Sequence, residues 1–281
     1  MMSDVLTELK DRSHFFRIIL FLALIIAGLR LALHGIYLGI MLYPDRNLIG
    51  ATPSEKGAQE ASMLPVDLQI YIDAARRLQN RQALYESAKV IEVYHYPPAY
   101  AAAFIPFLKL SPLGTVIVHT IVHIVAYIGL FLIWYRIFGR LGLQQAKDTL
   151  ITALPIWLLF TAFWSDLSYL NIYLIVALLS TFLIEAIIYE RLGASVLWLS
   201  VILHIKPHWA FAAAVPLLLG RWRFFLRTIT LSAIAYITVI AVMIVTIEPN
   251  YVVEQYINYI RFLEKLSREF PWRGPEAPFL G

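Results

Sequence analysis

The sequence predicts an all-α, multi-pass helical membrane protein, arranged as a single bundle of about seven spans over residues 1–281. Composition is the first observation, because 60% of the residues are hydrophobic and only 15% are charged, whereas a soluble domain carries roughly 25% charged residues. Mean hydropathy is the second, at +0.69. Third, several apolar runs are long enough to cross the ~30 Å hydrocarbon core as helices, and they lack the alternation of a membrane β-barrel strand.

The first apolar run predicts a retained span rather than a cleaved signal peptide. Residues 15–43 exceed the roughly 7–15-residue apolar region of such a peptide, and no small-x-small cleavage site follows them. Six more apolar segments follow, which gives seven predicted spans. The predicted spans are residues 15–43, 96–110, 112–135, 149–166, 168–189, 194–219 and 224–247.

Lysine and arginine residues near the span ends predict which side each loop faces, because cytoplasmic loops carry an excess of them. Lys10, Arg12 and Arg17 precede or open the first span, and three arginines lie around the junction of the sixth and seventh. Strict alternation places both groups in the cytoplasm. It then predicts that the loop 44–94 and the tail 248–281 lie together on the non-cytoplasmic side.

One loop conflicts with this orientation. Strict alternation puts residues 136–148 outside, although they contain Arg136, Arg140 and Lys147. Either this loop is an exception to the rule for basic residues, or the short segment 96–110 re-enters the membrane instead of crossing it. We retain strict alternation as the prediction, and it also places Asn171 near the inner face.

Composition also excludes several kinds of site. The chain has no cysteine, so it has no disulfide, thiolate metal site or cysteine nucleophile. Its net charge of +4 is small and scattered, and no motif or basic cluster predicts a nucleic-acid partner. No metal or other cofactor is expected. His119 and His123 share a helix face, which is a spacing that could hold a metal, but without a neighbouring carboxylate in sequence we expect helix-packing hydrogen bonds instead.

The loop 44–94 carries a predicted amphipathic helix with one carboxylate near its start. Pro65 suits a first helical turn, and at about 100° per residue Asp67 lies about 40° from Tyr71, near the edge of the apolar stripe. Spacing alone also allows Asp67 merely to complement the helix dipole. Residues at three- and four-residue spacing form the stripe, which predicts a helix in the interface plane: Leu68, Tyr71, Ile72, Ala75 and Leu78.

The tail predicts a second interfacial helix. Apolar residues recur at helical spacing between Tyr251 and Leu263, and Glu254, Glu264 and Lys265 lie mostly off that face. Such a helix could face the Asp67 helix across a shared opening.

The chain carries three short motifs in order: Asp67-x-x-x-Tyr71, then Leu84-Tyr85, then Tyr96-Pro97-Pro98 opening a span. Together they resemble the membrane glycosyltransferases of the GT-C class, and among them glycosyltransferase family 87. These are α-mannosyltransferase-like enzymes that use a polyprenyl-phosphate sugar as donor. The stretch His204 to Arg223 also resembles that family's lysine-containing span, which leads into a basic loop. The similarity covers most of the chain in order.

The resemblance implies transfer of a hexose, with mannose as the expected sugar, from a polyprenyl-phosphate-linked donor to a lipid or glycan acceptor. The reaction would take place at the non-cytoplasmic face of the plasma membrane, the cell inner membrane, where membrane lipids surround the protein. The resemblance assigns the general base to Asp67. The implied substrate-binding residues are Tyr71, His95, Tyr96, Asn171, Lys206 and His208.

Lys206 and His208 are the leading candidates to stabilise the phosphate leaving group, with Arg273 and His95 as further candidates. Ionisable groups inside an apolar run are functional candidates by default, and growing negative charge needs cationic or hydrogen-bonding partners. The other interpretation is a lysine that reaches to the interface beside a helix kinked by Pro207.

The chain departs from the family pattern at three places. The Gly usually found before the Leu-Tyr pair is replaced within Asn80 to Gln82. Where such proteins often show Gly-Gln-x-Asn, this sequence has Ser168-Tyr169-Leu170-Asn171 and keeps only the asparagine. Family members usually continue with further spans, so we expect this chain to be a fragment, a truncated product or a minimal version. Whether the chain is active by itself depends on whether the acceptor-binding parts lie within it.

Two other functions stay open at this stage. A polyprenyl-linked lipid transporter or flippase would be expected to show paired discontinuous spans in matching halves, and the broken sixth span has no clear counterpart. A non-catalytic membrane assembly subunit is the other alternative, which the short length allows.

Overall fold

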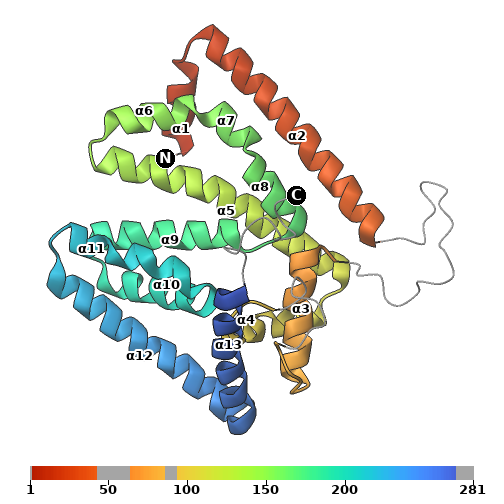
Figure 1. Ribbon diagram of the computed structural model, residues 1–281. Helices are drawn as coiled ribbons and strands as arrows, with labels where there is room; N and C mark the ends of the chain where they lie inside the picture. Colours follow the sequence, from red (N-terminus) through yellow and green to blue (C-terminus); the bar gives the residue numbers. More distant parts are fainter. Residues whose placement is uncertain (1, 43–63, 86–93, 270–281) are drawn as a thin grey trace.

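A computed structural model of the protein describes residues 2–42, 64–85 and 94–269 (Figure 1). These residues form helices joined by short turns, with no strand among them, which confirms the all-α class. Three helices are long and apolar enough to cross a membrane: α2 (His14–Leu42), α5 (Pro112–Arg140) and α12 (Trp222–Thr246). A fourth candidate is a pair of apolar segments bent by 48° at residue 153, which is long enough if the two segments form one span. The multi-pass prediction is confirmed.

The remaining elements are shorter. The bent pair consists of α6 (Gln144–Thr152) followed by α7 (Leu154–Leu159) and α8 (Thr161–Tyr169). The others are α1 (Met2–Lys10), α3 (Val66–Gln79), α4 (Pro98–Phe104), the 3₁₀ helix η2 (Ile105–Lys109), α9 (Tyr173–Ile188), α10 (Leu192–Ile205), the 3₁₀ helix η3 (Pro207–Ala214), α11 (Val215–Leu218) and α13 (Pro249–Glu269).

The segment 96–110 is not a span, and that prediction is wrong. Pro98 starts α4 at its first turn, as the Tyr-Pro-Pro motif predicted, but Pro106 lacks the N–H needed to continue an α-helix and the chain tightens into η2. The seven residues of α4 rise only about 10 Å, far less than the ~30 Å hydrocarbon core. Both α4 and η2 pack against α3 instead.

The predicted sixth span, 194–219, is two segments rather than one. Lys206 has an extended backbone conformation, with φ −140° and ψ 90°, and Pro207 opens η3 directly after it. Proline disfavours a helical residue before it, so α10 ends there and η3 with α11 turns back alongside it (Figure 1). Five of the seven predicted spans therefore correspond to apolar elements of the described chain: α2, α5, the bent pair, α9 and α12.

The basic loop 136–148 lies at the same end of the bundle as the N-terminus. Lys147 of α6 forms an ion pair with Glu8 of α1, and Arg12 forms another with Asp148 at 3.1 Å. Strict alternation placed these two regions on opposite sides of the membrane, which their direct contact rules out. The error arose from counting 96–110 as a crossing, and the re-entrant alternative is the one that the structure supports.

Further ion pairs bring more basic residues to the same end. Arg136 of α5 pairs with Glu185 of α9, and Arg221 at the start of α12 pairs with Glu190 at 3.1 Å. Arg221 also donates to the backbone carbonyls at the end of α9. The turns after α1, α5, α9 and α11 therefore share one end, which we call the basic end.

The opposite end gathers α3, α4 and α13 (Figure 1). Tyr251 of α13 donates to the carbonyl of Gln82 at 2.7 Å, and the N–H of Leu84 donates to the buried Gln255 at 2.9 Å. Arg81 pairs with Glu248 at 3.2 Å. These contacts confirm that the described parts of the loop 44–94 and of the tail lie together; residues 43–63, 86–93 and 270–281, including Arg273, are outside the described residues.

The apolar stripe of α3 is real, but its partner is protein rather than lipid. All five stripe residues are buried, and they form one core with α4 and with the end of α2. The stripe therefore packs on protein, and the position of α3 in the interface plane stays a prediction. Helix α13 has one buried face and one exposed apolar face. Tyr251, Val252 and Tyr259 are buried, whereas Ile257 and Ile260 are exposed, which is the pattern expected of an interfacial helix packed on one face.

Thiol labelling tests this arrangement of ends. Cysteines introduced at the exposed positions Asn80 and Glu254 should react with an impermeant reagent from the same side, because both lie at the α3 end. A cysteine at the exposed Gln145, at the basic end, should react only after permeabilisation or from the opposite side. The chain has no native cysteine to give background. Labelling of all three positions from one side would contradict the topology.

Candidate active site

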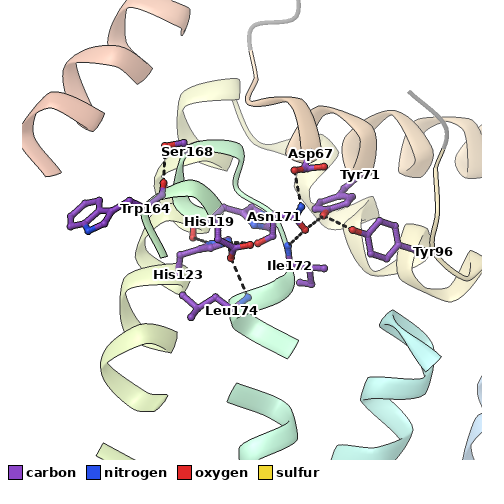
Figure 2. Close-up of polar contacts among 11 residues, drawn as sticks. Asp67, Tyr71, Tyr96, His119, His123, Trp164, Ser168, Asn171, Ile172 and Leu174 are labelled. Carbon is purple, nitrogen blue, oxygen red and sulfur yellow. Dashed lines mark hydrogen bonds and ion pairs between the residues drawn. The ribbon is translucent and has the colours of Figure 1, made fainter. Parts of the chain in front are cut away.

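Asp67 lies at the start of α3, and its carboxylate meets the turn between α8 and α9 (Figure 2). Oδ2 accepts a hydrogen bond from Nδ2 of Asn171 at 2.9 Å. Asp67 is half-buried, and among the described residues no partner is present for Oδ1. The carboxylate is therefore oriented through one oxygen and open at the other. The first-turn position also favours the carboxylate through the helix dipole.

The side chain of Asn171 forms hydrogen bonds to three groups at this end of the bundle. Its Oδ1 accepts from its neighbour's backbone, the N–H of Ile172, at 2.7 Å, and from the hydroxyl of Tyr71 at 3.2 Å. Two donors at one atom identify that atom as the oxygen, so the amide nitrogen must face Asp67. Strict alternation placed Asn171 near the inner face, and this is corrected: it lies at the α3 end, beside the carboxylate.

The chain turns sharply to present Asn171. Leu170 ends α8 in the left-handed region, with φ +50°, a conformation that costs a non-glycine residue free energy and persists only where its surroundings enforce it. The N–H of Asn171 then bonds back to the carbonyl of Asp166 at 3.0 Å, and α9 begins at Tyr173. The left-handed residue reverses the chain within one step and points the asparagine side chain at α3.

Two buried ionisable residues lie behind this turn. His123 of α5 contacts the carbonyl of Asn171 through Nε2 and the carbonyl of His119 through Nδ1, the latter at 2.7 Å. This agrees with the expected helix-packing hydrogen bonds, although Asp166 lies only 3.6 Å from Nε2. The side chains of His123 and Asp166 are 1% and 9% exposed. Within the described residues, no group of three or more histidine or acidic side chains could hold a metal ion.

Lys206 is a buried cation between aromatic rings. Its Nζ lies 3.4 Å from the ring centroid of Tyr173 and 5.1 Å from that of Tyr96, and the residue is 8% exposed. Such contacts stabilise a lysine by about 0.5–2 kcal/mol, but they leave its three N–H donors unused. Among the described residues no acceptor lies within hydrogen-bonding distance of Nζ, so the ammonium is available to an anion.

Tyrosines connect the lysine to the carboxylate. The hydroxyl groups of Tyr71 and Tyr96 are 2.9 Å apart and hydrogen-bonded, with their rings edge to face at 5.1 Å. Tyr100 packs against both rings. Because such aromatic pairs fix ring positions, Tyr96 serves at once as the wall beside Lys206 and as the partner of Tyr71.

Burial raises the pKa of the Asp67 carboxyl above its ordinary value, and the hydrogen bond from Asn171 and the charge of Lys206 oppose that rise. Water solvates the carboxylate form best, so partial removal from water disfavours it. A carboxyl group with a raised pKa is a stronger base when it is ionised. The two opposing contacts keep it ionised toward lower pH.

A largely apolar cavity of about 490 Å³ adjoins this cluster. Aromatic and aliphatic side chains of α5, α7, α8, α9 and η3 line it, among them Trp157, Phe163 and Trp209, and Asp166 and Asn171 are among its few polar walls. Ligand pockets of proteins fall in the range of about 300–1,000 Å³ and combine apolar walls with few polar groups. The cavity is suited to an apolar group whose polar end lies near Asn171.

Two predicted site residues do not join the cluster in this structure. His95 is exposed, and its ring packs against Phe262 of α13, with centroids 5.2 Å apart. His208 is exposed at the start of η3, near Lys206 but without a hydrogen bond to the described residues. The structure brings five of the candidate residues together: Asp67, Tyr71, Tyr96, Asn171 and Lys206.

Sequence reasoning missed three residues of this cluster: Asp166, His123 and Tyr173. Asp166 is a carboxylate in a predicted span, and an ionisable residue at that depth is a functional candidate by default; that signal could have found it. His123 was considered only beside His119, because no carboxylate is near it in sequence. Tyr173 gave no signal at all, since aromatic residues are common at span ends.

Comparison with known proteins gives one result. The sequence model of glycosyltransferase family 87 matches residues 94–277. No curated protein and no solved structure gives a significant match. The matched range covers more than half of the chain and includes Tyr96, Asn171 and Lys206, so the chain belongs to glycosyltransferase family 87.

Proposed function

We propose that this membrane glycosyltransferase moves a hexose, most simply mannose, from a polyprenyl-phosphate donor to a hydroxyl group of a lipid or glycan acceptor, with Asp67 as general base. One observation carries the proposal. A half-buried carboxylate, held through one oxygen by Asn171, shares a site with a buried ammonium that has no hydrogen-bond acceptor among the described residues. One group suits proton removal and the other suits an anionic leaving group.

The reaction follows from these two charges. The acceptor hydroxyl attacks the anomeric carbon, and its proton passes to the open oxygen of Asp67 as the new C–O bond forms. The bond between the anomeric carbon and the phosphate oxygen breaks, and the polyprenyl phosphate leaves with that electron pair. Lys206 stabilises the charge that grows on this oxygen. Electrostatic attraction between Lys206 and Asp67 supports such an arrangement.

The cavity beside Asn171 supports a lipid-linked donor. Its walls are mostly apolar, which favours a hydrocarbon chain over a nucleotide, and its polar wall at Asp166 and Asn171 lies next to the Asp67 cluster. A chain in the cavity would leave the phosphate and sugar at the polar end. Tyr71, Tyr96 and Asn171 would then frame the sugar.

The site is proposed to face the non-cytoplasmic side of the cell inner membrane. The basic end holds Lys10, Arg12, Arg136, Arg140, Lys147 and Arg221. Such residues remain in the cytoplasm by the rule for basic loops. Asp67 lies at the opposite end of the bundle.

Replacement of Asp67 tests the general base. Asp67→Asn keeps the side-chain size and much of its hydrogen bonding but cannot accept the proton, so turnover should fall about 10²–10⁴-fold with donor affinity little changed. Transfer would be measured with purified protein, radiolabelled polyprenyl-phosphate sugars and a membrane acceptor extract. Asp73→Asn is the matched control, because among the described residues Asp73 on the same helix bonds to Gln69 and Arg76 alone. Near-normal turnover in Asp67→Asn would overturn the assignment.

The pH dependence of turnover should show where Asp67 titrates. Only the ionised carboxylate accepts a proton, so activity should fall as pH drops through the pKa of Asp67. Because burial raises that pKa, the acid limb should lie above the value for an exposed aspartate, which is about 3.9. A limb at or below that value would contradict the burial argument.

Replacement of Lys206 tests phosphate recognition. Lys206→Met keeps an apolar side chain between the two tyrosine rings and removes the charge. A charge-assisted contact to phosphate contributes on the order of 1.5–3 kcal/mol, so donor affinity should weaken roughly ten- to a hundredfold. Lys109→Met, an exposed lysine at the end of η2, is the control. Unchanged donor affinity together with a lower melting temperature would make Lys206 a structural residue.

A further inference from the structure

The buried pair His123 and Asp166 takes no part in the proton transfer proposed above, yet both residues contact the backbone of Asn171. Figure 2 shows His123 beside Asn171. Burial of two ionisable groups costs free energy unless they are paired and hydrogen-bonded. Such a pair inside an apolar bundle therefore calls for a physical reason, and its contacts supply one.

Both ring nitrogens of His123 face carbonyl oxygens. Nδ1 contacts the carbonyl of His119 and Nε2 contacts that of Asn171. A carbonyl oxygen can only accept, whereas a neutral imidazole has one N–H donor and one lone pair. A neutral ring would direct its lone pair at an oxygen, which is repulsive. The contacts are satisfied together only by the imidazolium form, which carries two N–H donors.

Asp166 supplies the matching negative charge. Its Oδ2 lies 3.6 Å from Nε2 of His123 and accepts the N–H of Leu174 in the first turn of α9 at 3.1 Å. Its backbone carbonyl accepts the N–H of Asn171 at 3.0 Å. Asp166 thus holds both sides of the turn that carries Asn171, while His123 holds the carbonyl of Asn171 itself.

We propose that His123 and Asp166 form an ion pair of positioning residues, which fixes the backbone of Asn171 so that its side chain orients the Asp67 carboxylate. This inference rests on the proposed role of Asp67. The turn needs such support because Leu170 occupies the left-handed region. Without His123 the Asn171 carbonyl loses its donor, and the strained turn can relax and move the amide away from Asp67.

Charged and titratable groups surround both His123 and Asp67. His123 is faced by Asp166 of α8, by His34 of α2 and by His119 on its own helix. Asp67 is faced by Lys206, Asp166 and a group of tyrosines: Tyr71, Tyr96, Tyr100 and Tyr173. Asp166 therefore repels Asp67 directly as well as acting through Asn171. For this reason His123, rather than Asp166, is the residue to change in a pH profile.

The first measurement is kinetic. His123→Phe keeps an aromatic ring and removes both donors. Because a displacement of about 1 Å in a catalytic group can lower turnover ~10²-fold, kcat should fall by that order with the donor KM little changed. The acid limb should also move to higher pH, since the hydrogen bond from Asn171 holds the Asp67 carboxyl ionised. His119→Phe, one turn earlier on α5, leaves the His119 carbonyl in place and should retain the parent profile.

The decisive measurement is a double-mutant cycle. If His123 acts through Asn171, His123→Phe should reduce kcat strongly in the parent and hardly at all in an Asn171→Ala background, because coupled residues are not additive. Asp166→Asn keeps an acceptor for the N–H of Leu174 and removes the charge. If His123→Phe does not fold, Asp166→Asn replaces it in the same double-mutant cycle.

The outcomes separate this inference from the proposed function. Additive losses in the cycle overturn the positioning role. So does a His123→Phe protein that has an unchanged pH profile and only a lower melting temperature. In either case, an inactive Asp67→Asn still supports Asp67 as the general base. An active Asp67→Asn removes the general base itself and the inference with it. Non-additive losses with a shifted acid limb support both.

Discussion

The hydrogen bond between Asn171 and Asp67 is the contact on which the proposed chemistry of this protein depends, because it joins the extramembrane helix α3 to the membrane bundle at the reactive oxygen atoms. The amide of Asn171 serves three groups at once: Asp67, Tyr71 and the backbone of Ile172. Loss of that amide would leave several partly buried polar groups without partners, each at a cost of about 1–3 kcal/mol. The bond therefore contributes to the fold and to the orientation of Asp67 together.

A single constraint explains why the polar residues of the site lie at interruptions of helices. Backbone N–H and C=O groups in lipid must be satisfied within the protein, so irregular backbone is tolerated only where protein or a cavity surrounds it. Lys206 lies at the break between α10 and η3, and Asn171 lies at the break between α8 and α9. At each break the side chain reaches a site that an uninterrupted apolar helix could not present.

The predicted membrane side of every later loop depended on one short segment. Residues 96–110 are apolar enough to suggest a crossing, yet Pro106 limits them to a short α-helix and one 3₁₀ stretch. Once this segment is removed from the count, the basic loop 136–148 joins the N-terminus, where Glu8 and Arg12 make ion pairs with it. The conflict between loop 136–148 and the rule for basic residues therefore came from the count of crossings.

The sequence by itself determined the class, the long helices and the leading chemical candidates. Hydropathy and periodicity are local properties, so the ranges of α2, α5 and α12, the buried stripe of α3 and the helix start at Pro98 could be read from neighbouring residues. Asp67 and Lys206 could be singled out by residue type and by resemblance. Tertiary structure decided which residues meet: Asn171 beside Asp67 across 104 positions, and Asp166 beside His123. Such pairs depend on how the helices pack and where they break, and neither can be deduced from the spacing of residues along the chain.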